Sequence, residues 1–329
     1  LLSRVALYAE KWDVAAQAAR DCATAEGNLD LSKNGYAKIF ELGINSPEVL
    51  FAVEFKSSVI DHAYDAYVRP SGDTKELGKQ VYSGFVPTSE LVDSYEMAGD
   101  GGNFSWEKHG KDPYANREPR FYATILYNGA DWMGRKIESF VGGKDGYKAY
   151  ENAGAAGTTV TGYYLRKYLI DGDKTWVTSG SGQDWIVLRY AEVLLNKAEA
   201  LAMENWNKNS AEALQALNDV RARVGLPARA TADKETFLEY VRHERKVELA
   251  GEGFRYWDLR RWRLAEKVID GQNVHGVKIS KQSDGSFTYE QVDADGGHKR
   301  IFYDRYYRFA IPLSERSNNS LCTNNDGWI

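Results

Sequence analysis

The acidic residues between positions 244 and 252 are the first feature of this sequence that could do chemistry. Glu244, Glu248 and Glu252 are spaced four residues apart, which places them on one face of a helix. Two carboxylates can hydrolyse a glycosidic bond when they lie on opposite sides of it. The basic residues interleaved with these acids are Arg242, Arg245, Lys246, Arg255, Arg260 and Arg261. We therefore expect the acids to form structural ion pairs and hydrogen bonds at helix ends, not a catalytic pair.

Histidine and aspartate patterns give no metal or cofactor site. His243-Glu244 begins like the zinc motif HExxH, but Val247 occupies the position of the second histidine. Asp171-Gly172-Asp173 and Asp293-Ala294-Asp295-Gly296 resemble calcium loops that lack the full set of ligands, so we interpret them as turns and leave an incidental structural calcium ion open. The chain has no GxSxG elbow, Walker loop or dinucleotide fingerprint. The sequence thus predicts no cofactor and no enzyme activity.

Aromatic residues are numerous, and many lie among Gly, Asn and Asp in segments without helical periodicity. The chain has 9 Trp, 21 Tyr and 12 Phe, or 13% aromatic residues. A flat ring in a polar loop can stack on the apolar face of a sugar, beside polar side chains that bind its hydroxyl groups. The candidate ligand-binding residues are Tyr64, Tyr67, Tyr82, Asn103, Trp106 and Trp132. For each ring a role in the core is an open alternative, because large folds also need rings in their cores.

The charge balance argues against nucleic acid as a partner. Lys and Arg number 42 against 47 Asp and Glu, which gives a formal net charge of -5, whereas phosphate binding needs a concentrated positive field. No run of 18 apolar residues could span a membrane, and no secretory signal opens the sequence. Cys22 and Cys322 fit neither a disulfide pattern nor a metal motif. We therefore expect a globular chain without a membrane span of its own.

The elements that would position the candidate residues begin with helices. Residues 1–26 have the apolar spacing of two helical pieces and resemble a tetratricopeptide unit. This spacing is already present at Leu1 with no preceding cap or turn, so we expect further residues to precede it. A β-type run follows at 48–55. Residues 56–184 are rich in turn residues and rings, which predicts an ordered, loop-rich part because disordered segments contain few aromatics.

Helical periodicity returns in the second half of the chain. The predicted helices are 185–202, 211–224, a helix that begins after Thr231 or Thr236 and is interrupted at Gly251 and Gly253, and 255–269. The first two form a helical hairpin that ends at Gly225-Leu226-Pro227. Beyond Gly271 we expect loops, a β-hairpin that turns at Ser283-Asp284-Gly285, and a polar tail.

Three ordered stretches together resemble the SusD/RagB family, the surface partners of TonB-dependent transporters. The stretches are 188–200 with 217–223 and 225–227, then 244–262, and finally 311–313, Glu315 and 325–328. Weaker agreement extends back through 119–121, 128–129 and 161–168, so the resemblance covers essentially the whole chain. In this family the segment that contains Glu244 looks like scaffold, in agreement with the ion pairs expected above.

The resemblance implies a mainly α fold. A tetratricopeptide-like helical scaffold would carry a loop-rich subdomain with a few short strands. The expected parts are a helical segment at 1–55, a loop-rich, aromatic, ligand-binding subdomain at 56–184, helical scaffold with the family motifs at 185–270, and C-terminal loops and a tail packed on the scaffold at 271–329.

The resemblance also implies a function. Family members bind a nutrient at the cell surface and deliver it to a SusC-like TonB-dependent transporter, and an N-terminal lipid anchor, absent from this sequence, holds them to the outer membrane. We therefore expect non-catalytic binding of a glycan, an oligosaccharide or polysaccharide. The alternative is a tetratricopeptide-type module that binds a protein or peptide, as in RagB-like peptide uptake. A glycoside hydrolase would need two facing carboxylates about 5 to 10 Å apart in a cleft.

Overall fold

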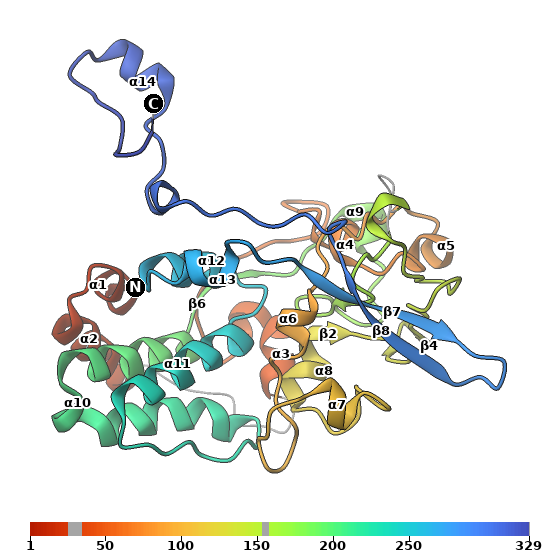
Figure 1. Cartoon of the computed structure of the whole chain (residues 1–329), viewed down its shortest axis with the longest axis horizontal. Helices are drawn as coiled ribbons and strands as arrows, with labels where there is room; N and C mark the ends of the chain where they lie inside the picture. Colours follow the sequence, from red (N-terminus) through yellow and green to blue (C-terminus); the bar gives the residue numbers. More distant parts are fainter. Residues whose placement is uncertain (26–34, 153–157, 329) are drawn as a thin grey trace.

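The structure, a computed structural model, describes residues 1–25, 35–152 and 158–328. Helices dominate this part of the chain, and its strands form separate two-stranded pairs (Figure 1). The prediction of a mainly α fold that carries a few short strands is confirmed.

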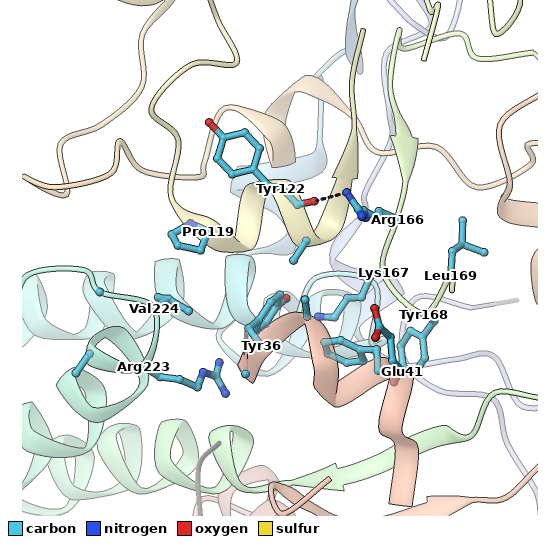
Figure 2. A pocket seen from close by; sticks show the side chains of 16 residues that line it. Tyr36, Glu41, Pro119, Tyr122, Arg166, Lys167, Tyr168, Leu169, Arg223 and Val224 are labelled. Atoms are coloured by element: carbon cyan, nitrogen blue, oxygen red, sulfur yellow. Dashed lines mark hydrogen bonds between the residues drawn. The ribbon is translucent and has the colours of Figure 1, made fainter. Parts of the chain in front are cut away.

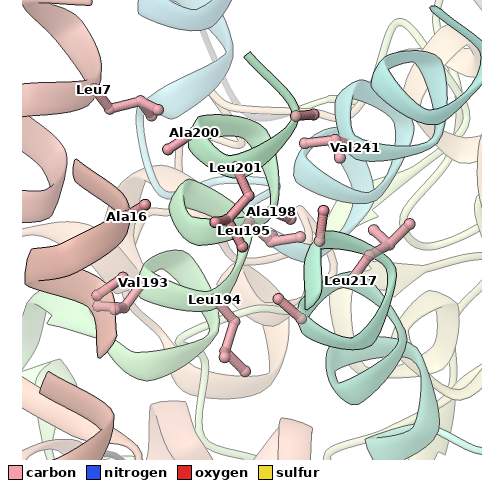
Figure 3. Close-up of a cluster of buried hydrophobic side chains, with 14 of the residues drawn as sticks. Leu7, Ala16, Val193, Leu194, Leu195, Ala198, Ala200, Leu201, Leu217 and Val241 are labelled. Atoms are coloured by element: carbon pink, nitrogen blue, oxygen red, sulfur yellow. The ribbon is translucent and has the colours of Figure 1, made fainter. Parts of the chain in front are cut away.

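Four helices form the scaffold. They are α1 (Leu2–Tyr8), α2 (Trp12–Ala25), α10 (Tyr190–Arg223) and α11 (Lys234–Glu248). Helix α1 packs on α2, α2 on α10, and α10 on α11. Figure 3 shows the core between them, where small residues such as Ala16 and Ala198 alternate with Leu195, Leu217 and Val241. The alanines let the helices approach closely while the larger side chains fill the remaining space.

Helix α10 contains the predicted hairpin, but it begins later than expected. Asn205 has non-helical angles (φ −164°, ψ 95°) and separates the two halves of α10. Residues 185–189 were expected to be helical, and this is wrong: they form β6 (Trp185–Arg189), which pairs antiparallel with β1 (Val49–Val53). A short apolar run fits a buried strand as well as a helix by periodicity alone, and β1 supplies the partner strand.

The third predicted helix is α11. The helical spacing of the residues that follow it, which predicts one helix, belongs to two. The Asp233 carboxylate caps α11 by accepting a hydrogen bond from the Thr236 N–H at 2.7 Å. The single helical stretch expected at 255–269 consists of α12 (Phe254–Arg261) and α13 (Ala265–Ile269). Arg263, with φ +56°, breaks the helical path between them.

The loop-rich part is built from very short elements around a buried arginine. Helix α3 (Gly35–Leu42) precedes this part, whose own helices are α4 (Tyr64–Val68), α5 (Asp73–Leu77), α6 (Ser89–Val92), α7 (Trp106–His109), α8 (Pro119–Thr124) and α9 (Trp176–Ser179). The short strand pairs are β2 (Ile125–Leu126) with β5 (Tyr164–Leu165) and β3 (Asp131–Trp132) with β4 (Arg135–Lys136). The Arg69 guanidinium lies 5.2 Å from the ring centroids of both Trp132 and Trp176 and pairs with Asp65 at 2.7 Å. The cation–π and ionic contacts of Arg69 thus help to stabilise a part of the chain that has no long regular elements.

The C-terminal part follows the prediction at first and then departs from it. Strands β7 (His275–Lys281) and β8 (Phe287–Asp293) pair around the predicted turn. Phe302 packs with Leu259 of α12 and Ala265 of α13. Helix α14 (Leu313–Asn318) instead lies away from the scaffold (Figure 1), with Leu313 exposed. The prediction that the whole tail packs on the scaffold is therefore wrong for α14, because the tail bonds to itself: the Trp328 indole N–H donates to the Arg308 carbonyl at 2.9 Å.

A buried network of ion pairs joins these parts, and its centre is formed by Glu244 and Glu248 of α11 together with Glu252. Glu248 binds Arg120 (3.0 Å), Arg189 (2.6 Å) and Arg223, which come from α8, β6 and α10. Burial alone would raise the pKa of Glu248, but the three guanidinium groups lower it well below its ordinary value. Glu244 is also paired, with Arg120 and Arg221. The expected structural pairing of these acids is confirmed.

Glu252, just beyond α11, extends the network toward the loop-rich part. Gly251 adopts φ +76°, a conformation that favours glycine, and turns the chain between α11 and Glu252. The Glu252 carboxylate then accepts two hydrogen bonds from Arg189, both at 2.7 Å, and one from Lys167 at 2.6 Å. Strand β6 and the segment after β5 are thereby fixed to the end of α11.

Glu248→Gln is expected to lower the free energy of unfolding by about 3–5 kcal/mol, because it removes one negative charge from a buried cluster in which three arginines share it. Chemical denaturation with guanidinium chloride measures this loss. Glu239→Gln is the matched control on the same helix, since Glu239 forms an exposed pair with Arg242 and should change stability by less than about 1 kcal/mol. Equal effects of the two substitutions would contradict the central role of Glu248.

Candidate functional site

An aromatic groove lies where the loop-rich part meets β6 and the end of α11. The cavity has a volume of about 560 Å³. Its lining residues are Phe55, His62, Ala63, Tyr64, Tyr67, Val68, Phe85, Leu165, Trp185 and Gly251. We call this cavity, together with Tyr82 at its edge, the aromatic groove. Its size falls within the range of small-ligand sites, and its wall is mostly apolar.

Helix α4 places two of the rings, Tyr64 and Tyr67, which are three residues apart and lie on one side of this short helix. The Tyr64 hydroxyl donates to the Lys167 carbonyl at 2.8 Å. His62 precedes the helix, and its ring bonds the Gln183 carbonyl through Nε2 (3.0 Å) and the Tyr64 N–H through Nδ1 (3.2 Å). Both bonds form together when the ring is neutral and its proton is on Nε2. The base of the groove is therefore fixed before any ligand binds.

A tight loop places two further rings beside Tyr67. Tyr82 stacks on Tyr67 with ring centroids 5.1 Å apart and planes at 26°. The backbone N–H groups of Tyr82 and Gly84 donate to the carbonyls of Ala66 and Tyr67, both at 2.7 Å. Between them Ser83 has φ +47°. The chain therefore turns sharply and is bonded to α4 on both sides of the turn.

These rings remain accessible although their positions are fixed. Tyr67, Tyr82 and Phe85 have 47%, 45% and 64% of their surface exposed. On the other wall, Trp185 stacks on Tyr168 at 4.8 Å and 14°, and its backbone pairs with Val53 in the β1–β6 ladder. A flat ligand can therefore reach ring faces that are held by the fold.

Polar tips surround these ring faces. Among the residues that the structure describes, none forms a hydrogen bond with the hydroxyl of Tyr67, the hydroxyl of Tyr82 or the indole N–H of Trp185. Each tip can thus donate to a ligand, and the two hydroxyls can also accept. Ring faces with adjacent hydrogen-bonding tips suit a ligand that has both apolar faces and hydroxyl groups.

The structure brings three of the six predicted residues together. Tyr64, Tyr67 and Tyr82 belong to the aromatic groove. Asn103 is exposed near α7, away from the groove, and Trp106 begins α7, where its indole N–H donates to Asp93 at 2.9 Å and its ring lies 6.2 Å from Tyr289.

Trp132 has a different role from the one predicted. It is fully buried, and its indole N–H donates to Asp73 at 3.0 Å. A ring without exposed surface cannot stack on a ligand, so the assignment of Trp132 to the ligand site is wrong. Trp132 stabilises the loop-rich part through its contact with Arg69.

Sequence reasoning missed Phe55, His62, Phe85 and Trp185. Trp185 was overlooked because residues 185–189 were interpreted as helix, in which this ring would have belonged to a buried stripe. Phe85 had a local signal, since Tyr82-Ser83-Gly84-Phe85 sets two rings on either side of a turn-forming pair. Nothing local indicated Phe55 and His62, because only the tertiary structure sets them against α4.

A second cavity of about 560 Å³ lies on the other side of Tyr168 (Figure 2). Its rings, Tyr36, Phe40 and Tyr168, are buried and pack on one another. Of its charged side chains, Lys167 and Arg223 are already paired with Glu252 and Glu248. The wall begins at Gly35, next to residues 26–34, which lie outside the described chain, so we assign no site to this cavity.

Within the described residues, no group of three or more His, Cys, Asp or Glu side chains could hold a metal ion. The residues that line the aromatic groove include no carboxylate. Two facing carboxylates are what most glycoside hydrolases require. The groove therefore offers binding surface and not an acid–base pair.

Comparisons with known proteins point to one family. The model of the SusD family matches residues 47–328. The curated SusD-like protein P38 of Formosa agariphila is 32% identical over 133 residues, which cover 37% of this chain and 25% of P38.

Solved structures agree in fold. A SusD-like protein from Bacteroides fragilis superposes with a TM-score of 0.82 at 25% identity, over 99% of this chain and 64% of that structure. A SusD-like carbohydrate binding protein from the same species gives 0.78 at 25% identity, over 97% and 62%. Surface glycan-binding protein A from Bacteroides thetaiotaomicron gives 0.62 at 20% identity, over 98% and 62%. The chain thus spans less than two thirds of these structures and about a quarter of P38.

The burial of Asp93 beside Trp106 predicts that the stability of the protein depends on pH. Burial raises the pKa of Asp93 to about 6, although the Trp106 hydrogen bond lowers it. Because this pKa lies above that of an unfolded aspartate, the folded state binds the proton more readily, so stability falls as the pH rises from about 4 to about 6 and the full cost of ionised Asp93 is present above pH 6. Asp93→Asn removes the charge and keeps the acceptor. It should stabilise the protein by about 1–3 kcal/mol near pH 8 and progressively less toward pH 5.

Chemical denaturation at several pH values measures this difference. Asp131→Asn is the control, because Asp131 is exposed and its removal should change stability equally at each pH. A difference between Asp93→Asn and wild type that does not vary with pH would show that Asp93 titrates like an exposed carboxyl.

Proposed function

This chain belongs to the SusD family, and from this premise we propose that it binds a glycan without changing it chemically, with saccharide units held in the aromatic groove. The observation that carries the proposal is the accessible set of rings formed by Tyr67, Tyr82 and Phe85, opposite Trp185. Sugar rings have apolar faces that pack on aromatic rings and hydroxyl groups that the free tyrosine and indole tips can bind.

The relatives support this ligand class. One structural neighbour at 25% identity is a SusD-like carbohydrate binding protein, and another neighbour is a surface glycan-binding protein. The groove adds an independent physical reason, because its rings are positioned by backbone bonds to α4 and by the β1–β6 pair and not by one another alone. A pre-positioned site loses little conformational freedom when a ligand binds.

The wider role follows from the family. We propose that the full-length protein works at the outer surface of the outer membrane, held there by a lipid anchor, and delivers the glycan to a SusC-like TonB-dependent transporter. None of the described helices combines the length and apolar character needed to cross a bilayer. The scaffold helices α1, α2 and α11 have faces turned away from the core, as helix-pair arrays do when they meet partners.

Peptide binding is the second candidate, and the mostly apolar wall of the aromatic groove favours it. Apolar peptide side chains could fill the space between Phe55, Val68 and Phe85. The two candidates differ in what they need from the groove. A sugar uses ring faces together with the tyrosine hydroxyls, whereas an apolar peptide uses only the contact area.

The main prediction concerns the exposed tyrosine rings of the aromatic groove. In calorimetry or affinity gels against a panel of neutral and charged polysaccharides, Tyr67→Ala and Tyr82→Ala should each weaken binding of the recognised glycan by about tenfold, or about 1.4 kcal/mol. Tyr82→Phe, which keeps the ring, should have a smaller effect. Tyr150→Ala is the matched control, because Tyr150 is 49% exposed and lies outside the groove.

Three results would count against the proposal. Binding of a peptide library with no saccharide bound would favour the peptide candidate. Unchanged glycan affinity in both alanine variants would remove the aromatic groove as the site. Release of shortened sugars during prolonged incubation would show catalysis and contradict binding without turnover.

A further inference from the structure

A third cavity, of about 590 Å³, lies between α6, the turns around α12 and α13, and β7. Its polar lining residues are Glu90, Lys246, Arg255, Gln272, Asn273, His275 and Arg300, and Tyr256 provides an exposed ring. We call it the cationic cleft. Gly251 lines both this cleft and the aromatic groove, so the two cavities adjoin at the end of α11.

Most buried cations in the described part of the chain pair with a carboxylate. Buried arginines in ion pairs are Arg69, Arg120, Arg189, Arg221, Arg223 and Arg245, whereas the buried Arg117 donates instead to the backbone carbonyls of Pro113, Val92 and Tyr95. The buried Lys167 is paired with Glu252. Such pairing is expected, because a charge removed from water without a partner lowers stability.

Lys246 and Arg255 depart from this pattern. Both are half-buried, and neither forms an ion pair with any carboxylate in the described residues. The Lys246 ammonium donates only to the Glu90 carbonyl and the Ser94 hydroxyl. Burial, together with the charge of the nearby Arg255, lowers the pKa of Lys246 to about 8, although Glu90 and Asp93 oppose this shift. The two cations therefore repel each other at the wall of an open cavity.

The acids around Arg255 are already occupied. Burial also lowers the pKa of Arg255, against the weaker attraction of Asp258 and Glu239. Asp258, one turn further along α12, pairs with Arg245 and Arg261, both at 2.8 Å. The acid on the same helix therefore does not fully neutralise the charge of Arg255.

The charge of the cleft as a whole is positive. Its lining contains three cations, Lys246, Arg255 and Arg300, against the single carboxylate of Glu90. The Glu90 Oε1 atom accepts from the His275 backbone N–H at 3.1 Å and from its Nδ1 at 2.6 Å, so this acid is also engaged. A local excess of positive charge in a chain of net charge -5 attracts an anion.

We infer that the cationic cleft binds the carboxylate or sulfate group of an acidic glycan, with Tyr256 against the sugar ring that carries it. Tyr256 is 46% exposed, and Arg260 lies 5.1 Å from its ring centroid on the same helix. Because the cleft adjoins the aromatic groove at Gly251, one glycan chain can occupy both cavities. This inference rests on the proposed function and specifies its ligand as an acidic polysaccharide.

Titration calorimetry with three oligosaccharides of equal length tests it: a neutral galactan, an oligogalacturonate and a sulfated galactan. The expected result is preferential binding of one acidic sugar, with a charge-assisted contact worth about tenfold in affinity. Arg255→Gln and Lys246→Gln should each remove about that factor and leave neutral sugars unaffected. Higher salt should weaken binding of the acidic sugar to the wild type. Comparison of the two acidic sugars shows whether the cleft binds a carboxylate or a sulfate group.

The controls and outcomes below distinguish a failure of this inference from a failure of the proposed function. Lys208→Gln removes an exposed cation outside the cleft and should change nothing. Without glycan, both cleft variants should melt at or above the wild-type temperature, because a poorly compensated charge has been removed. Equal binding of acidic and neutral sugars with both variants unaffected would overturn the inference and leave glycan binding standing. Binding of a polyglutamate peptide with no saccharide bound would overturn both.

Discussion

The buried carboxylate of Glu248 is the interaction on which the rest of this structure depends. It pairs with Arg120 of α8, Arg189 of β6 and Arg223 at the far end of α10. Removing this carboxylate would take the shared negative charge away from three buried guanidinium groups, at a cost of several kcal/mol. The segments must therefore be in place together, and the loop-rich part is held to the scaffold although it has few regular elements of its own.

The same network builds the aromatic groove. Glu252 holds Arg189 at one end of β6, and Trp185 at the other end forms one wall of the groove. Glu252 also holds Lys167, whose carbonyl accepts the Tyr64 hydroxyl at the base of the groove. One carboxylate thus ties the base of the groove to the strand that carries Trp185. Pre-positioned rings lose little freedom on binding, which suits a protein whose proposed task is capture and release.

Much of this architecture could be predicted from the sequence. The period of the apolar residues indicated the scaffold helices, and the four-residue spacing of Glu244, Glu248 and Glu252 among basic residues indicated ion pairs. Both are local properties of the chain. Tyr64, Tyr67 and Tyr82 were found for a related reason, because rings among turn residues after a β-type run are visible without knowledge of the fold.

What the sequence by itself determined is therefore the mainly helical class, the family and the set of residues able to pair or to stack. The tertiary structure decided which of them do so. It buried Trp132 against Arg69, turned residues 185–189 into a strand beside β1, and left the half-buried Lys246 and Arg255 without an ionic partner among the residues that the structure describes. Exposure and pairing depend on neighbours that are distant along the chain. Spacing along the sequence fixes which side of an element a residue occupies, and only packing decides whether that side meets the core, a counter-charge or solvent.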